Sequence, residues 1–90
     1  MFYTYILESL KDKKLYVGYT SNLKRRFAEH NRGEVSITKN RRPFNLVYYE
    51  AYFNQQDATS REKFFKKGWG RTYLKKALKN YWQKGPVAQG

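Results

Sequence analysis

The chain has 90 residues, which is enough for one domain and too few for a second hydrophobic core. It contains no cysteine, which excludes a disulfide framework and a thiolate metal site. No apolar run approaches the roughly 20 residues of a membrane span, and no signal peptide opens the chain. A soluble, cytoplasmic protein is therefore expected.

The net charge of +12 is concentrated in two segments. Residues 61–84 carry nine Lys and Arg against one acid, and residues 24–42 carry seven against two, whereas the charges of the remaining segments nearly cancel. Two basic blocks are typical of a surface that binds a polyanion, and nucleic acid is the commonest such partner. A membrane surface fits less well, because no insertion face is evident. A merely solvated basic surface is the remaining alternative.

In chain order, residues 2–7 and 15–19 are rich in aromatic and β-branched side chains and predict two strands. The polar residues 9–14 between them have the length of a hairpin connection, so the two strands are expected to be antiparallel. Tyr5 and Tyr16 would then share one face of the hairpin only in some registers, and alternation alone does not fix the register.

Residues 20–22 all offer capping oxygens and predict the start of a basic helix. Helical spacing puts Leu23, Phe27 and His30 on one face. Arg26 lies at the edge of that face. Two interpretations stay open: polar groups held over a cleft, or an ordinary amphipathic helix whose histidine is a satisfied edge residue.

Residues 46–53 are nearly continuous in strand formers, as expected of a third strand that is covered on both faces. Glu50 is the exception within this run. We expect it near an edge or paired with a basic neighbour, and assign it no chemistry.

Residues 54–57 offer caps for a second helix that runs to about Lys67. One stripe of this helix is expected to face inward: Ala58, Glu62, Phe65 and Trp69. An inward carboxylate costs free energy unless a positive group meets it. Two partners are open for Glu62: an ion pair with Arg26 or Arg61, or a divalent cation, which prefers oxygen ligands.

Residues 68–70 are expected to break this helix, and a third helix is predicted from about Arg71. Its inward residues would be Tyr73, Leu74, Ala77, Leu78 and Tyr81. Its outward face would carry Lys75, Lys76 and Lys79, either contacting phosphate or simply solvated. Residues 83–90 are expected to be a flexible tail, which leaves one domain over residues 1–82. The fold class is α/β in a layered α+β form: a small, mainly antiparallel three-stranded sheet flanked by helices, in the order β-β-α-β-α-α.

The motifs Tyr3-Thr-Tyr5, Tyr16-Val-Gly18, Asn22-Leu-Lys-Arg-Arg26 and His30, in this order, resemble the GIY-YIG nuclease domain. Arg41-Arg-Pro43, Leu46-Val-Tyr48 and Arg61-Glu62-Lys63 are similar to its small stand-alone, excinuclease-like branch. The likeness spans about residues 2–82. It has two departures: the leading Gly-Ile of the family is Tyr3-Thr4 here, and the asparagine that follows the glutamate in some members has only Asn80 as a candidate.

The resemblance implies a metal-dependent endonuclease that hydrolyses DNA phosphodiester bonds, with DNA repair or processing as its setting. The catalytic residues that it implies are Tyr5, Tyr16, Arg26, His30 and Glu62. Of these, Glu62 would hold the Mg²⁺ or Mn²⁺ ion, and either tyrosine could orient the attacking water and accept its proton. A free phenol titrates near ~10, so a tyrosine base needs nearby positive charge, which Arg26 or the metal can supply.

The expected nucleic-acid-binding residues belong to the two basic blocks: Lys24, Arg25, Lys39, Arg41, Arg42, Lys66, Lys75, Lys76 and Lys79. DNA is the expected partner, with RNA as an alternative and no membrane contact, and a protein partner could supply targeting. The rival function is a basic DNA- or RNA-binding module that keeps this fold without cutting.

Overall fold

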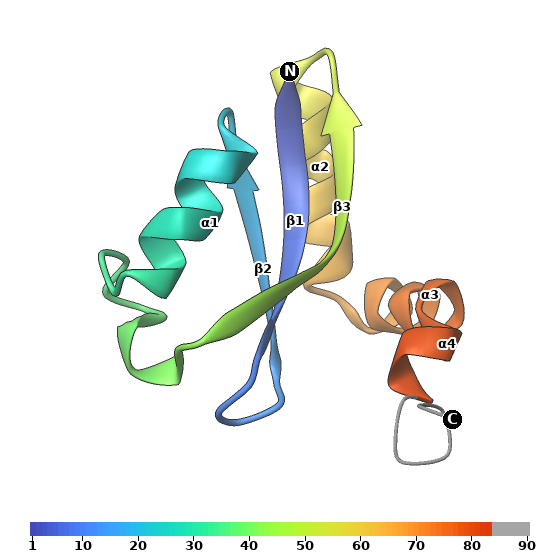
Figure 1. Ribbon diagram of the computed structural model, residues 1–90. Helices are drawn as coiled ribbons and strands as arrows, with labels where there is room; N and C mark the ends of the chain where they lie inside the picture. The colour runs from blue at the N-terminus through green and yellow to red at the C-terminus, as the bar shows by residue number, and fades with distance from the viewer. Residues whose placement is uncertain (84–90) are drawn as a thin grey trace.

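The computed structural model describes residues 1–83, which form a three-stranded antiparallel sheet flanked by helices. Figure 1 shows β1 at the centre of the sheet, between β2 and β3. The predicted α+β fold and the order of its main elements are confirmed. The elements are β1 (Phe2–Ser9), β2 (Leu15–Thr20), α1 (Leu23–Asn31), the 3₁₀ helix η1 (Lys39–Arg41), β3 (Phe44–Tyr52), α2 (Gln55–Phe65), α3 (Gly68–Ala77) and α4 (Lys79–Trp82).

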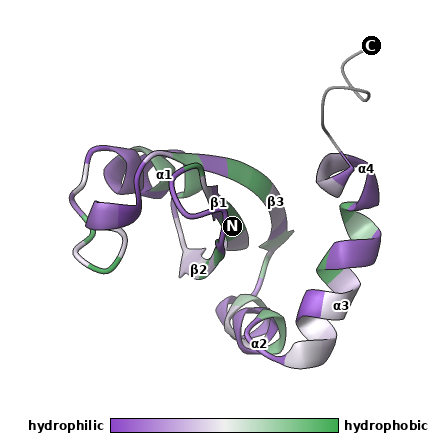
Figure 2. Ribbon diagram, turned by 90° about the horizontal axis from the view of Figure 1, so that it is seen from below, coloured by the Kyte–Doolittle hydropathy of each residue, from purple (hydrophilic) through white to green (hydrophobic). Residues whose placement is uncertain are grey.

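The helices cover both faces of the sheet, with α1 and α2 on opposite sides (Figure 2). The face toward α1 is built around Tyr5, Leu7 and Phe44. The opposite face packs Ile6 and Val17 against Phe65 of α2 and Leu74 of α3. This division follows from β1, whose successive side chains point to alternate faces, so that its buried residues supply both cores.

The helix starts follow the predicted caps. Asn22 caps α1 by accepting a hydrogen bond from the backbone N–H of Arg25, at 3.1 Å. Asn54 caps α2 by accepting from the backbone N–H of Gln56, at 2.8 Å. A side-chain oxygen in this position satisfies a backbone donor that has no partner within its helix.

We expected from its composition that the third strand would be covered on both faces, but it is not. It is an edge strand, and Tyr49 within it is 52 % exposed. The strand buried on both faces is β1 instead. Tyrosine explains the error, because a phenol ring can pack on its apolar body while its hydroxyl reaches water or a polar partner.

The C-terminal helices differ from the prediction in their boundaries. Residues 68–70 form the first turn of α3 and do not separate it from a helix starting at Arg71. A Cβ atom on Gly70 would lie 2.1 Å from the carbonyl oxygen of Phe64, so glycine lets α3 approach the end of α2 closely. Because α2 ends at Phe65, Trp69 leaves the inward stripe and is 68 % exposed.

The inward face predicted for the third helix is only partly correct. Leu74 is buried and Leu78 is half-buried, but Ala77 is exposed and Tyr73 is 41 % exposed. The helix turns at Leu78 into the separate α4, which changes which side chains face the core. Of the expected tail, Gln83 follows α4 in a turn, and residues 84–90 lie outside the described residues.

Candidate active site

Tyr5 lies at the centre of the candidate site because of its place in the sheet. The register of the hairpin pairs Tyr5 with Gly18 and Leu7 with Tyr16, so both tyrosines point to the α1 face. Their ring centroids are 6.4 Å apart. A Cβ atom on Gly18 would lie 2.3 Å from Cζ of Tyr5, so only glycine leaves room for this ring across β2. The register that the sequence left open is thereby decided.

His30 joins the tyrosine to the loop that follows α1. Its Nε2 atom lies 2.8 Å from the hydroxyl of Tyr5, and its Nδ1 atom lies 2.7 Å from Oγ1 of Thr38. Thr38 also donates to the carbonyl oxygen of Val35, at 3.4 Å. With the hydroxyl hydrogen of Thr38 used in this way, Nδ1–H of His30 donates to Thr38 and Nε2 accepts from Tyr5.

The three residues that these hydrogen bonds join, Tyr5, His30 and Thr38, are all buried, and the side chains of His30 and Thr38 are fully enclosed. Burial and, to a smaller extent, the positive charge of Arg26 lower the pKa of His30 to about 4, against the opposing effect of Glu29. His30 is therefore neutral at neutral pH. Its two ring nitrogens serve to hold Tyr5 in place and do not supply charge.

Lowering the pH from 7.5 to 5 should destabilise the fold by about 2 kcal/mol through His30. The unfolded state binds a proton near pH 6.5, whereas the folded state does so only near pH 4. Between these values the unfolded state binds more protons, so stability falls as the pH falls. Urea unfolding at several pH values measures this loss.

The matched control for this prediction is His30→Gln, since the amide keeps one donor and one acceptor but does not titrate. His30 is the only histidine in the chain, so the variant removes the only side chain that ordinarily titrates in this range. A wild type and a variant that lose the same stability between pH 7.5 and pH 5 would contradict the assignment.

The two tyrosines differ in their access to water. Tyr5 is 1 % exposed, and burial raises its pKa to about 12 even though the neighbouring guanidinium of Arg26 acts in the opposite direction. Tyr16 is half-buried, with its ring centroid 5.2 Å from that of His30. A water molecule can therefore approach Tyr16 more readily than Tyr5.

Arg26 and Glu62 reach the same cluster from different helices. Arg26 lies on α1, where Nη1 donates to Oε1 of Glu29 at 3.1 Å, and its side chain is 38 % exposed. Glu62 lies on α2, and its negative charge is one of the influences that raise the pKa of Tyr5. A cation and an anion thus flank the tyrosine from opposite sides of the sheet.

The predicted inward position of Glu62 is partly met, since its side chain is 24 % exposed. Its ion-pair partner is neither of the arginines that we considered. Oε2 of Glu62 accepts from Nζ of Lys66 at 3.2 Å, one helical turn away, whereas Arg61 points to Glu50 on β3. The pairing of Glu50 with a basic neighbour at a sheet edge is as predicted.

Comparison with known proteins identifies the family of the chain. The model of the GIY-YIG catalytic domain matches residues 1–80. The chain belongs to the GIY-YIG family. It is 49 % identical over 82 residues to the UPF0213 protein in the ldhD 5' region of Pediococcus acidilactici, a match that covers 88 % of this chain and 82 % of that one.

A second relative is a UPF0213 protein of Streptococcus pyogenes serotype M3. It is 47 % identical over 66 residues, which cover 72 % of this chain and 71 % of that one. Among solved structures, the chain is similar to the solution NMR structure of the UPF0213 protein BH0048 from Bacillus halodurans. The TM-score is 0.53 at 32 % identity, covering 98 % of this chain and 92 % of that one.

Membership of the GIY-YIG family indicates a nuclease, hence a hydrolase with DNA as its substrate. The metal chemistry implied by the family can be compared with the donors that this chain offers. Within residues 1–83, no three His, Asp or Glu side chains gather into a ready-made metal cage. Glu62 offers one carboxylate, and within the same residues its Oε1 atom accepts no hydrogen bond. A lone carboxylate fits Mg²⁺, which keeps several waters and is often completed by substrate phosphates.

The nine basic residues predicted to bind nucleic acid divide by their partners. Three form ion pairs with acids: Arg25 with Glu29, Arg41 with Asp12, and Lys66 with Glu62. Six are exposed and have no carboxylate partner within residues 1–83: Lys24, Lys39, Arg42, Lys75, Lys76 and Lys79. These six cations are the more available to phosphate, because the others are already partly neutralised.

Thr38 is the member of the site that sequence reasoning missed. It lies in the polar loop between α1 and β3, where a threonine carries no periodic or motif signal. Only the fold of this loop, in which Thr38 precedes η1, brings its hydroxyl to His30.

No helix within residues 1–83 is long and apolar enough to cross a membrane.

Proposed function

We propose that this protein is a divalent-metal-dependent endonuclease that hydrolyses DNA phosphodiester bonds. The observation that supports this most directly is the cluster around Tyr5, in which a phenol fixed by a neutral histidine lies beside an arginine and a second, accessible tyrosine and feels the charge of the Glu62 carboxylate. DNA repair or processing is the setting that the family resemblance suggests.

In this proposal Tyr16 orients the attacking water and accepts its proton. Tyr16 fits this role better than Tyr5, because the Tyr5 hydroxyl is buried and already bonded to His30. A proton acceptor must lie within hydrogen-bond reach of the water, which a half-buried side chain at the surface of the cluster permits.

Arg26 would stabilise the charge that builds up on the phosphate oxygens during attack. Its guanidinium is partly exposed, so it can donate to a phosphate while Glu29 holds it in place. Its positive charge also acts on the phenol of Tyr5, where it opposes the rise in pKa that burial causes. His30 and Thr38 are positioning residues that keep Tyr5 fixed.

Glu62 is the residue that would hold the metal ion. When bound there, a divalent ion supplies charge stabilisation for the leaving oxygen and the non-bridging oxygens. The effect of the negative charge of Glu62 on Tyr5, across the sheet from Arg26, is the feature that supports this role.

The test is a cleavage assay on plasmid and branched DNA with Mg²⁺ or Mn²⁺, run beside Glu62→Gln and beside a sample with excess chelator. We expect cleavage by the wild type and only background in the other two. Glu34→Gln is the matched control, since Glu34 pairs with Arg32 on the exposed surface and should keep full activity. A wild type that binds DNA without cutting any substrate above the Glu62→Gln background would identify a binding module on the same fold.

A further inference from the structure

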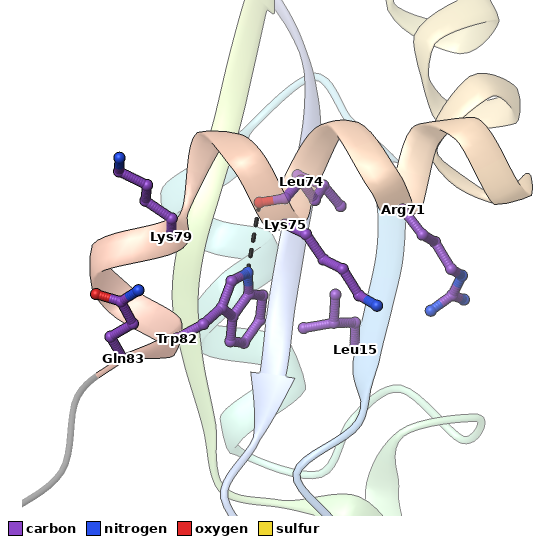
Figure 3. A pocket seen from close by; sticks show the side chains of 7 residues that line it. All are labelled: Leu15, Arg71, Leu74, Lys75, Lys79, Trp82 and Gln83. Atoms are coloured by element: carbon purple, nitrogen blue, oxygen red, sulfur yellow. Dashed lines mark hydrogen bonds between the residues drawn. The ribbon is translucent and has the colours of Figure 1, made fainter.

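A groove of about 480 Å³ lies between the start of β2 and the C-terminal helices, on the sheet face opposite Tyr16. Figure 3 shows the indole of Trp82 and the side chain of Leu15 facing each other, with Lys75 and Arg71 extending beside them. Leu74 adds to the apolar floor. The groove therefore combines an apolar base and an aromatic ring with a basic rim.

The cations of the rim have no carboxylate partner in the part of the chain that the structure describes. Arg71 and Lys75 lie one turn apart on α3, where like charges repel one another, and Lys79 follows at the start of α4. Within residues 1–83 none of them pairs with a carboxylate, in contrast to Arg61 and Arg41. A line of unpaired cations beside a groove is complementary to the phosphates of a polynucleotide.

Trp82 gives this groove a feature that a purely electrostatic surface lacks. Its indole N–H donates to the carbonyl oxygen of Leu74 at 3.4 Å, which fixes the orientation of the ring. Bases of single-stranded nucleic acid stack on such rings with a gain of about 1–3 kcal/mol each. Paired bases inside a duplex do not present their faces, so the ring selects an unpaired strand.

The groove and the candidate active site meet at the edge of the sheet. Leu15 lines the groove. The next residue, Tyr16, belongs to the cluster around Tyr5 on the other face, because neighbouring side chains of a strand point to opposite faces. Among the described residues, no strand pairs with the outer edge of β2. A neighbouring hollow of about 540 Å³, which shares Leu15 and Arg71, adds Lys13 and Lys14 to the basic lining.

We propose that this groove binds a single-stranded arm of the DNA substrate, with phosphates on the cationic rim and a base stacked on Trp82. This inference rests on the proposed nuclease function, and it specifies the substrate: DNA with an unpaired strand next to the bond that is cut. The arm would pass over the free edge of β2 from the groove to the catalytic cluster.

The test uses the fluorescence of Trp82 in the full chain with the substitution Trp69→Phe, which leaves one tryptophan. Trp69 is largely exposed, so this change should leave the fold intact. In excess chelator, a ten-nucleotide dT strand should quench the fluorescence, whereas heparin, a polyanion without bases, should not. Equal quenching by heparin and dT, or none by dT, would overturn the stacking of a base on Trp82.

Two matched double variants separate the groove from the general charge. Lys75→Gln/Lys79→Gln should weaken binding of the dT strand and lower the slope of log affinity against log salt by about 1.4. Lys63→Gln/Lys67→Gln removes the same charge from exposed residues outside the groove and should leave the slope unchanged. Equal effects of the two variants would overturn the groove as the binding site.

Trp82→Ala should raise the Kd for the dT strand about tenfold without changing that for a duplex of equal length. Circular dichroism checks that the variant is folded, and Trp82→Phe, which keeps an aromatic face, should restore most of the affinity. Quenching and tight dT binding in a protein that cuts no DNA would support the groove and overturn only the proposed function.

Discussion

Tyr16→Phe should lower the rate of DNA cleavage by about 10²–10⁴-fold while leaving the thermal unfolding midpoint unchanged. The substitution removes only the hydroxyl of a half-buried ring, and that hydroxyl is the proton acceptor in the proposed function. The ring keeps its contacts with Tyr5 and His30, so packing is preserved. Single-turnover cleavage with saturating DNA measures the loss.

Tyr5→Phe is the matched comparison, because it removes the same atom from the neighbouring ring. This hydroxyl is buried and bonded to Nε2 of His30, so its loss leaves a buried acceptor without a partner and should cost about 1–3 kcal/mol of stability. The cleavage rate per folded molecule should fall less than for Tyr16→Phe. If the cleavage rate fell further in Tyr5→Phe than in Tyr16→Phe, Tyr5 and not Tyr16 would be the proton acceptor.

The elements that the sequence predicted well are those with strong local signals. The caps Asn22 and Asn54 and the stripe of Leu23, Phe27 and His30 depend on residues within one or two helical turns. In a short helix such signals decide both the start and the buried face. The placement of His30 on the core side of α1 could therefore be read before any tertiary contact was known.

The features that escaped prediction depend on distant contacts. The start of α3 depends on how closely Gly70 approaches Phe64. The edge position of β3 depends on its pairing with β1, which already pairs with β2 on its other side. The composition of the sequence indicates neither the start of α3 nor the position of β3 in the sheet. The same limit explains Thr38, whose hydroxyl meets His30 only because the intervening loop folds back.

The candidate site shows the same division between local and distant information. The helical wheel placed Glu62 toward the interior but could not choose its partner, because the reach of Arg61 to β3 depends on how α2 lies across the sheet. The register of Tyr5 and Tyr16 was undetermined until the close approach of the Tyr5 ring to Gly18 was known.

Glu50 connects β3 to α2, and its removal should be strongly destabilising. Its carboxylate accepts hydrogen bonds from Tyr48 and Tyr52 on its own strand and from Nε and Nη2 of Arg61, at 2.8 and 3.1 Å. The guanidinium in turn lies 4.4 Å from the ring centroid of Phe64. Burial alone would raise the pKa of Glu50, but these donors hold it below its usual range.

Glu50→Ala should lower the free energy of unfolding by about 3 kcal/mol, at the lower end of the range for breaking a buried ion pair, since Arg61 is partly exposed. Urea unfolding measures the change. Glu34→Ala is the control: its ion pair with Arg32 is even shorter, at 2.6 Å, but both side chains are more than half exposed, so stability should not change. Equal losses in the two variants would contradict the role of burial.

The double variant Glu50→Ala/Arg61→Met distinguishes an ion pair from simple packing. Each single change leaves the other charge partly buried without its partner, whereas the double change removes both charges and keeps an apolar chain against Phe64 and Tyr73. The double variant should therefore be clearly more stable than the sum of the single losses predicts. Strict additivity would mean that Arg61 is held by the aromatic rings and not by Glu50.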